Sequence, residues 1–194
     1  MCIRDRVTGA GLEFGEAGGA SEMMFMAIRA LAYEWTGRGP ATKITTAILE
    51  KYKIKNLHDL LQGLICHQFE VDGSDVLRVF KAAAQGDAVA IDLIRWTGRE
   101  LGELANTVIR QLHFENISFD LVQIGSMFDG SPLLTEEMKR VVHAIAPGAN
   151  FIRSKVPPVM GAVILGMHAA GIKPEPEGRA RLDSSISGFQ TDNN

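Results

Sequence analysis

Two glycine-containing segments have the composition of ligand-binding loops. In residues 119–128 a run of apolar side chains ends at Gly125 and Ser126, and an amphipathic pattern begins after residue 131. This order predicts a buried strand, a turn and a helix. In open α/β sheets, ligands bind beyond the carboxyl ends of strands, where small residues let backbone N–H groups approach phosphate or sugar oxygens. The alternative is that the glycine serves a purely steric role, and the segment alone leaves both interpretations open.

The second segment, residues 7–19, contains five glycines, at positions 9, 11, 15, 18 and 19. Glycine supplies positive φ angles and room for a ligand against the backbone. The spacing is neither that of a dinucleotide-binding turn nor that of a P-loop. Glu13, Glu16 and Glu22 accompany these glycines. Taken by themselves, these residues are best interpreted as solvated carboxylates near a helix N-terminus, where the helix dipole favours them.

Other reactive side chains are isolated. The five histidines share no i, i+4 pair, which argues against a metal site. Cys2 and Cys66 form neither a disulfide framework nor a metal-ligand spacing, which fits a reducing cytoplasm. Asp87 is typical of a helix start. Arg38, in Gly-Arg-Gly-Pro, suits either a phosphate contact or a helix stop.

The composition is that of an ordinary globular protein. Hydrophobic residues make up 46%, charged residues 22%, and the net charge is −3 without a basic stripe. Nucleic acid and anionic membranes are therefore not expected partners. The most apolar run, residues 159–167, is shorter than the roughly 20 residues that span a bilayer. It follows Pro157 and Pro158 and is predicted to be a core helix, buried against the sheet.

Hydrophobic periodicity predicts a helix-rich chain with a small sheet. The expected helices cover residues 21–35, 42–52, 57–68, 75–84, 88–112, 135–146 and 158–170, and the expected strands cover residues 121–124 and 151–153. Residues 7–172 are expected to form one lobe, and residues 173–194 a disordered tail. Residues 1–6 have the character of translated adapter sequence, the alternative being a genuine N-terminal arm.

Taken in order, several short motifs resemble the C-terminal part of N-acetylglucosamine kinases and the wider BadF/BadG-type ATPase family. They are Gly9-Ala10-Gly11, Gly15-Glu16-Ala17-Gly18-Gly19, Gly37-Arg38-Gly39-Pro40-Ala41-Thr42, Ala84-Gln85-Gly86-Asp87, Ile124-Gly125-Ser126-Met127-Phe128, Ala146-Pro147-Gly148-Ala149 and Pro157-Pro158-Val159-Met160-Gly161-Ala162. The resemblance covers about residues 7–171. It implies an α/β fold, namely the helix-rich C-terminal lobe of an actin/hexokinase-like (ribonuclease H-like) ATPase, with ATP and Mg²⁺ as its ligands.

The resemblance also implies roles for individual residues. Gly125 and Ser126 match the family's adenosine-side loop, and Gly73 lies near a second adenosine contact. Gly9, Ala10 and Gly11 match a Gly-Trp-Gly segment of the sugar pocket, and Glu16 matches an acidic residue that accepts hydrogen bonds from sugar hydroxyls. Ala10 stands where the family has tryptophan, Glu16 replaces aspartate, and Ala17 replaces a second acidic residue. These departures put N-acetylglucosamine as the substrate in more doubt than ATP.

The family's first phosphate-binding loop and catalytic aspartate belong to its N-terminal domain, so the chain resembles half of an active site. Three functions follow as alternatives: an ATP-dependent kinase of an amino sugar, an ATPase activator of a 2-hydroxyacyl-CoA dehydratase or benzoyl-CoA reductase, and a non-catalytic sugar-sensing regulator. The activators hold an iron–sulfur cluster through cysteines, which Cys66 alone does not provide. A small sugar is the expected partner, and a homodimer is an open alternative.

Overall fold

The computed structural model describes residues 14–154, 158–173 and 178. By its contacts the chain divides into two units, residues 1–121 with 125–151, and residues 122–124 with 152–194. The predicted leader (1–6) and nearly all of the predicted tail (173–194) lie outside the described residues.

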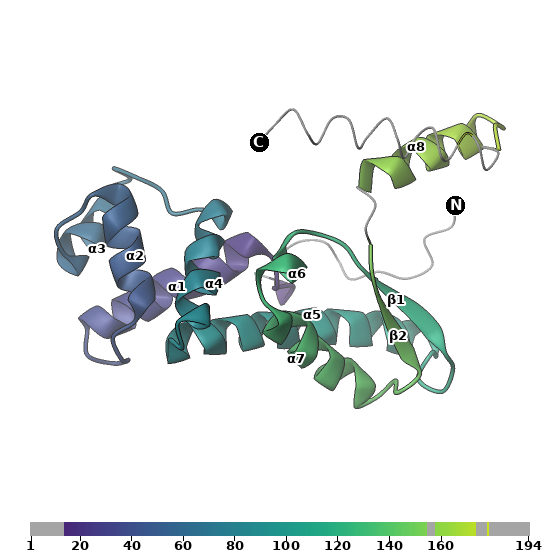
Figure 1. The fold of residues 1–194 in the computed structure, drawn as a ribbon, viewed down its shortest axis with the longest axis horizontal. Coiled ribbons are helices and arrows are strands. Elements are labelled where there is room, and N and C mark those ends of the chain that lie inside the picture. Colours follow the sequence, from purple (N-terminus) through teal and green to yellow (C-terminus); the bar gives the residue numbers. More distant parts are fainter. Residues whose placement is uncertain (1–13, 155–157, 174–177, 179–194) are drawn as a thin grey trace. The chain divides into compact units, whose positions relative to one another are not determined.

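The first unit is built mainly of helices (Figure 1). In chain order the elements are α1 (Ala20–Trp35), α2 (Lys43–Tyr52), α3 (Leu57–Ile65), a 3₁₀ turn (Gly73–Asp75), α4 (Val76–Ala84), α5 (Ala88–Leu112), β1 (Phe119–Gln123), α6 (Met127–Gly130), α7 (Pro132–His143) and β2 (Ala149–Arg153). The second unit contains the carboxyl ends of both strands and α8 (Pro158–Ala169). The predicted helix-rich α/β chain with a small sheet is confirmed.

Short polar side chains determine where several helices begin. Thr42 accepts a hydrogen bond from the amide of Ile44, and Asn56 accepts one from the amide of Asp59. Ser131 accepts one from the amide of Leu133, and Pro132 occupies the first turn of α7. Such caps satisfy amides that have no partner within the helix. They explain why α7 begins three residues before the predicted position.

Two helices end earlier than predicted because their last carbonyls are satisfied by local turns. After α3, His67 adopts a left-handed conformation, and the amide of Gln68 donates to the carbonyl of Gly63. After α7, the carbonyl of Val142 accepts from the amide of Ala146. Turns of this kind close a helix C-terminus. The predictions of helix to residues 68 and 146 were therefore wrong by three residues each.

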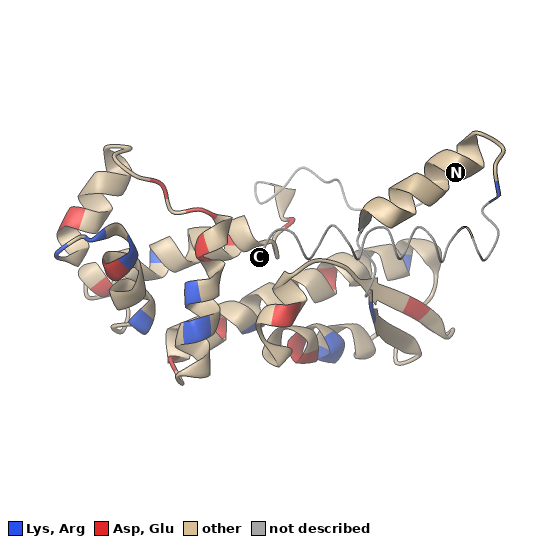
Figure 2. Cartoon of the chain, turned by 45° about the horizontal axis from the view of Figure 1, so that its top comes forward, with Lys and Arg blue, Asp and Glu red and all other residues tan. Residues whose placement is uncertain are grey.

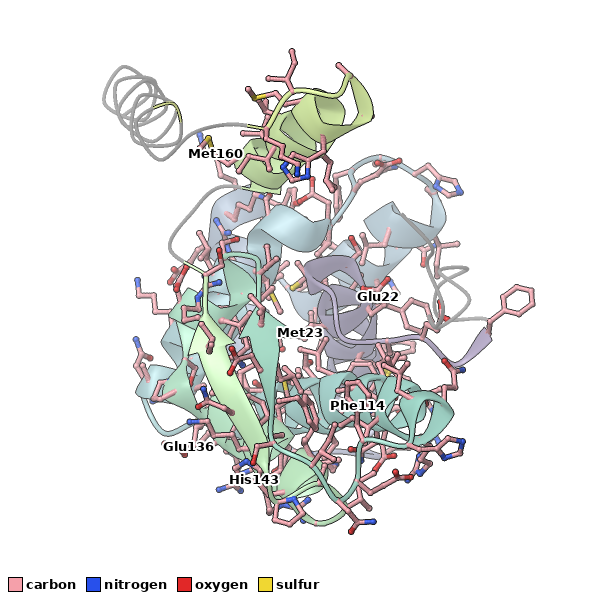
Figure 3. All side chains as sticks on the ribbon, turned by 90° about the vertical axis from the view of Figure 1, so that its right-hand side faces the viewer. Glu22, Met23, Phe114, Glu136, His143 and Met160 are labelled. Atoms are coloured by element: carbon pink, nitrogen blue, oxygen red, sulfur yellow. The ribbon has the colours of Figure 1, made fainter. Side chains whose placement is uncertain are left out.

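The main core of the first unit lies among α1, α2, α4 and α5. Its fully buried side chains include Met23 (labelled in Figure 3) and Met24 from α1, Ile48 from α2 and Ile94 from α5. Removing such side chains from water is the dominant favourable term in folding. The two methionines are core residues.

Helices α5 and α7 approach each other closely and run side by side (Figure 1). A Cβ atom added at Gly98 would lie 2.7 Å from the carbonyl oxygen of Leu134 and 2.9 Å from Glu137 Cβ. At Gly102 it would lie 2.8 Å from the side chain of Val141. The two glycines are one helical turn apart and face α7. They therefore set how closely the helices pack.

The sheet consists of two parallel strands, β1 and β2. On one face Phe119, Leu121 and Phe151 pack against a buried cluster that includes Ile109 of α5 and Val142 of α7. Phe114 and His143, both labelled in Figure 3, extend this contact, because the Phe114 ring lies tilted against that of Phe119, with centroids 5.3 Å apart, and the His143 ring meets Phe151 edge-on.

The prediction that the apolar run of residues 119–124 is a buried strand was partly wrong. Val122 is 51% exposed and Ile124 is 52% exposed. Helices cover one face of the two-stranded sheet, so side chains that alternate along β1 fall into two different environments.

Helix α8 forms where the sequence predicts it, but several of its apolar side chains are exposed, unlike those of the buried core helix that the sequence predicts. Val159, Val163 and Leu165 are exposed, and Met160 (Figure 3) is buried. Nothing lies within 4 Å of a Cβ placed at Gly161 or Gly166. The side chains of α8 itself are apolar around its whole circumference, so the sequence does not mark one face of the helix for packing. Among the described residues, no helix has both the length and the apolar character needed to cross a membrane.

Replacing Gly98 by valine is expected to destabilise the first unit. The added side chain would clash with the backbone of α7, and overpacking of this kind costs roughly 1–3 kcal/mol. Urea unfolding followed by circular dichroism measures the change. Gly166→Ala is the matched control, because it adds a Cβ to a helical glycine in open space and should stabilise its helix by up to about 1 kcal/mol. Equal effects of the two substitutions would show that the α5–α7 contact does not depend on Gly98.

Candidate functional site

The loop after β1 has the strand–turn–helix geometry predicted from the sequence. Gly125 has φ = +116°, a conformation that strongly favours glycine. Its carbonyl accepts from the amide of Phe128 (3.4 Å), and that of Ser126 accepts from the amide of Asp129 (2.9 Å). Ser126 is exposed, and a Cβ at Gly125 would meet nothing within 4 Å. There is open space beside this loop. A glycine is needed at position 125 because of its positive φ angle, since a Cβ atom there would meet no neighbouring atom.

Gly73, the other residue expected near the nucleotide, lies in the 3₁₀ turn that precedes α4. A Cβ at this position would lie 3.2 Å from Ser21 Oγ and 3.3 Å from Ala20 Cβ. The absence of a side chain lets the turn pack on the first turn of α1. Gly73 thus sits on a different element from Gly125 and Ser126, and its surroundings give it a packing role.

Of the residues expected to contact a sugar, Gly9, Ala10 and Gly11 lie outside the described residues. Glu16 is half-buried and precedes α1 by four residues. Gly18 (φ = +128°) presses against Leu101 of α5, where a Cβ would lie 2.7 Å from Leu101 Cγ. Glu22, in the first turn of α1, folds over Gly19. The first turn of α1 thus follows Glu16 closely in the sequence. The same turn contacts Gly73, the residue that is expected near the nucleotide.

A buried carboxylate, that of Asp75, was not predicted from the sequence. Its side chain is fully buried and accepts from Lys51 Nζ at 2.6 Å and from Arg78 at 2.9 Å. The hydroxyl of Tyr52 lies 3.0 Å away. Hydrogen bonds to Asp75 and Tyr52 raise the pKa of Lys51, and burial raises the pKa of Tyr52. Engaged by these donors, this carboxylate ties α2 to α4 and is not a free catalytic base.

The sequence contained a signal for this cluster. Asp72 and Asp75 are three residues apart and form a capping box, in which Asp72 accepts from the amide of Ser74 and Asp75 accepts from the amide of Asp72. That spacing is a known helix-start pattern. The cationic partner Lys51 comes from a distant part of the chain, so the pattern alone could not reveal the ion pairs.

Two of the motifs that carry the family resemblance meet at Asp87. One oxygen of this carboxylate accepts from Thr42 Oγ1 (2.9 Å) and from the amide of Ala90 (2.8 Å). The other accepts from the amide of Lys43 (2.7 Å). Lys43 Nζ also donates to the carbonyl of Gln85 (2.8 Å). Asp87 starts α5, as predicted, and in addition fixes the start of α2 to it.

Hydrogen bonding determines the charge state of Asp87. Burial raises the pKa of its carboxyl, but the amides of Lys43 and Ala90, with the hydroxyl of Thr42, outweigh that effect and hold the pKa below its usual value. A carboxylate with several donors is stabilised in its ionised form. Asp87 is therefore a structural anion at the junction of α2 and α5.

Arg38 was open to two interpretations, and its surroundings support the helix stop. Gly37 has φ = +73°, and the amide of Arg38 donates to the carbonyl of Tyr33 at 2.8 Å. The Arg38 guanidinium lies 4.2 Å from the centre of the Tyr33 ring. This is the geometry of a cation–π contact at a closed helix end.

The described residues contain no cluster of three or more His, Cys, Asp or Glu that could hold a metal ion. Cys66 is a free, exposed thiol.

Comparison with curated proteins places this chain near sugar kinases. It is 22% identical over 171 residues to an N-acetyl-D-glucosamine kinase of Dictyostelium discoideum, covering 86% of this chain and 54% of the relative. It is 25% identical over 162 residues to an N-acetylmuramic acid/N-acetylglucosamine kinase of Clostridium acetobutylicum, covering 82% of this chain and 53% of the relative. No family model matches the chain.

The chain thus spans about half the length of the curated relatives it matches. It is distantly similar to kinases of N-acetylated amino sugars across most of its own length. This is the family that the motifs around Gly125 and Asp87 resemble.

Replacing Asp87 by asparagine is expected to lower stability at pH 7 by about 1–2 kcal/mol, because an amide supplies fewer acceptors to the three donors. The folded-state pKa of Asp87 is depressed, so its stabilisation is fully present above about pH 4, the usual carboxyl value. This stabilisation is lost as the pH falls through the pKa that Asp87 has in the folded protein. The difference between wild type and variant should therefore shrink on acidification.

Urea unfolding at a series of pH values from 7 to 3 measures this difference. Asp92→Asn, at an exposed position on α5, is the matched control and should change stability by less than about 0.5 kcal/mol. If the difference in unfolding free energy between wild type and Asp87→Asn stayed constant down to pH 3, Asp87 would not stabilise the fold through its ionised form.

Proposed function

We propose that the protein to which this chain belongs is an ATP-dependent kinase that transfers a phosphoryl group to a hydroxyl of an amino sugar such as N-acetylglucosamine. The observation that carries the proposal is the similarity to two kinases of such sugars over more than four-fifths of the chain. The chain would form the C-terminal lobe of an actin/hexokinase-like fold. The proposed setting is the cytoplasm, where ATP, Mg²⁺ and small sugars are available.

The loop at Gly125 and Ser126 suits the adenosine side of ATP. It follows a parallel strand, its glycine leaves open space beside the backbone, and its serine hydroxyl is exposed. Small residues at the carboxyl end of a strand let a ligand approach backbone groups closely. In this proposal the loop binds and orients the nucleotide and takes no part in proton transfer.

The glycine-rich segment before α1 suits the sugar. The Glu16 carboxylate offers several acceptor lone pairs for hydroxyl donors. Gly9, Ala10 and Gly11 would line the same pocket. Ala10 provides no aromatic surface for a pyranose ring, so hydrogen bonding would contribute more to sugar recognition.

Phosphoryl transfer depends on positioning, on neutralisation of charge around Mg²⁺ and on a carboxylate base. The buried carboxylates of this chain, Asp75 and Asp87, are already engaged by donors. We therefore propose that the base, the Mg²⁺ environment and the first phosphate-binding loop come from a further part of the protein, which corresponds to the half of the relatives that this chain does not match. A homodimer is compatible with this arrangement.

Ser126→Trp is expected to weaken ATP binding by the full protein at least about tenfold, which corresponds to 1.4 kcal/mol. The indole would fill the open space beside Gly125. Ser118→Trp is the matched control, because Ser118 is exposed at the opposite end of β1 and should leave affinity within about twofold. Calorimetric titration with ATP measures both. If Ser126→Trp left the affinity for ATP unchanged, the loop at Gly125 and Ser126 would not be part of the nucleotide site.

The chain alone is expected to show no sugar-dependent release of ADP and at best about millimolar affinity for ATP. Loss of about 4 kcal/mol of phosphate and Mg²⁺ contacts weakens a dissociation constant roughly a thousandfold. The measurement is ADP release by residues 7–172 with N-acetylglucosamine and other sugars, beside ATP titration. Sugar-dependent turnover would require a catalytic carboxylate within this chain.

A further inference from the structure

A groove with a volume of about 350 Å³ lies between α2 and α4, within the first unit. Each helix lines it with residues spaced i, i+3, i+4 and i+7, which is one continuous helical face. These residues are Lys43, Thr46, Ala47 and Glu50 from α2, and Arg78, Lys81, Ala82 and Gln85 from α4 and its C-cap. Two alanines at equivalent positions leave the centre hollow.

Polar contacts hold the two walls together at both ends of the groove. At one end Lys43 Nζ donates to the carbonyl of Gln85. At the other, Lys51 and Arg78 both pair with the buried Asp75. Since the two faces are tied at their ends, the groove is preorganised, and a ligand would not need to separate the helices.

The charge of the groove contrasts with that of the chain. The chain as a whole carries −3, whereas the groove has three cationic side chains (Lys43, Arg78 and Lys81) and one carboxylate (Glu50). Arg78 and Lys81 are the two basic residues of α4, blue in Figure 2. Clefts lined by one sign of charge concentrate ions of the opposite sign.

These cations keep unused hydrogen-bond donors. An ammonium group has three N–H donors and a guanidinium has five. Among the described residues, Lys43 Nζ donates to the carbonyl of Gln85, and one guanidinium nitrogen of Arg78 pairs with Asp75. The hydroxyl of Thr46 adds a further donor at the same level as Ala47.

We propose that this groove binds a small molecule carrying a phosphate group, of the size of a sugar monophosphate. Lys81 on α4 and Lys43 on α2 would bind the phosphate, since a phosphate oxygen accepts charge-assisted hydrogen bonds from such groups. A volume of about 350 Å³ is within the range of small-molecule sites and leaves room for more than the phosphate. Glu50 would face the hydroxyl-bearing part. This site does not depend on the proposed kinase activity.

The test is a titration of the folded chain with glucose 6-phosphate, inorganic phosphate and glucose, followed by ¹H–¹⁵N correlation spectra. We expect glucose 6-phosphate to shift amides of α2 and α4, inorganic phosphate to shift them with weaker affinity, and glucose to have no effect. Equal affinity for inorganic phosphate and glucose 6-phosphate would contradict the proposal that the ligand is as large as a sugar monophosphate. Shifts confined to other elements would overturn the site.

Charge variants separate a specific site from general attraction. Lys81→Glu reverses a charge in the groove and should weaken glucose 6-phosphate binding about tenfold at low ionic strength. Lys55→Glu makes the same change at an exposed position outside the groove and should change affinity less than about twofold. Glu50→Gln removes the opposing carboxylate and should strengthen binding about threefold. Equal losses for Lys81→Glu and Lys55→Glu, or weaker binding in Glu50→Gln, would contradict the proposal.

Discussion

The contact of α5 with α7 is the constraint on which the rest of the structure depends. Helix α5 is 25 residues long, and it packs against α1, α4 and α7. Gly98 and Gly102 bring its backbone close to α7, which lies on the connection between the two strands of the sheet. A side chain at Gly98 would clash with the backbone of α7, so this glycine limits how α7 can pack on α5.

Two buried carboxylates organise the helices on the other side of α5. Asp87 joins the starts of α2 and α5, and Asp75 joins the end of α2 to the start of α4. Removing the donors of a buried carboxylate is costly, because the charge is then left uncompensated. Motif residues such as Thr42 and Asp87 therefore have a structural explanation. Resemblance through such motifs indicates a shared fold more directly than a shared substrate.

The sequence predicted the elements well where local signals were strong. The helix start at Asp87 and the turn at Gly125 depend on neighbouring residues, and the structure confirms them. Side-chain environments were harder to predict. Val122 was expected to be buried with the rest of its strand, and α8 was expected in the core, because apolar runs look the same whether one face or both are covered. The Asp75 cluster depends on Lys51, which is 24 residues away, and local patterns carry no information about such pairs.

The candidate site likewise combines features fixed by neighbouring residues with features that need distant parts of the chain. The conformation of Gly125 arises within its own loop, which explains why a sequence pattern could identify it. Catalysis of phosphoryl transfer needs charge neutralisation and a base held within hydrogen-bond reach of the acceptor, and such groups come together only through tertiary structure. The carboxylates that this chain buries already hold helices together. In the proposed arrangement, one lobe positions the nucleotide and another supplies the reactive groups. The chemistry would then take place where the two lobes meet, and closure of the lobes would both assemble the site and exclude water from it.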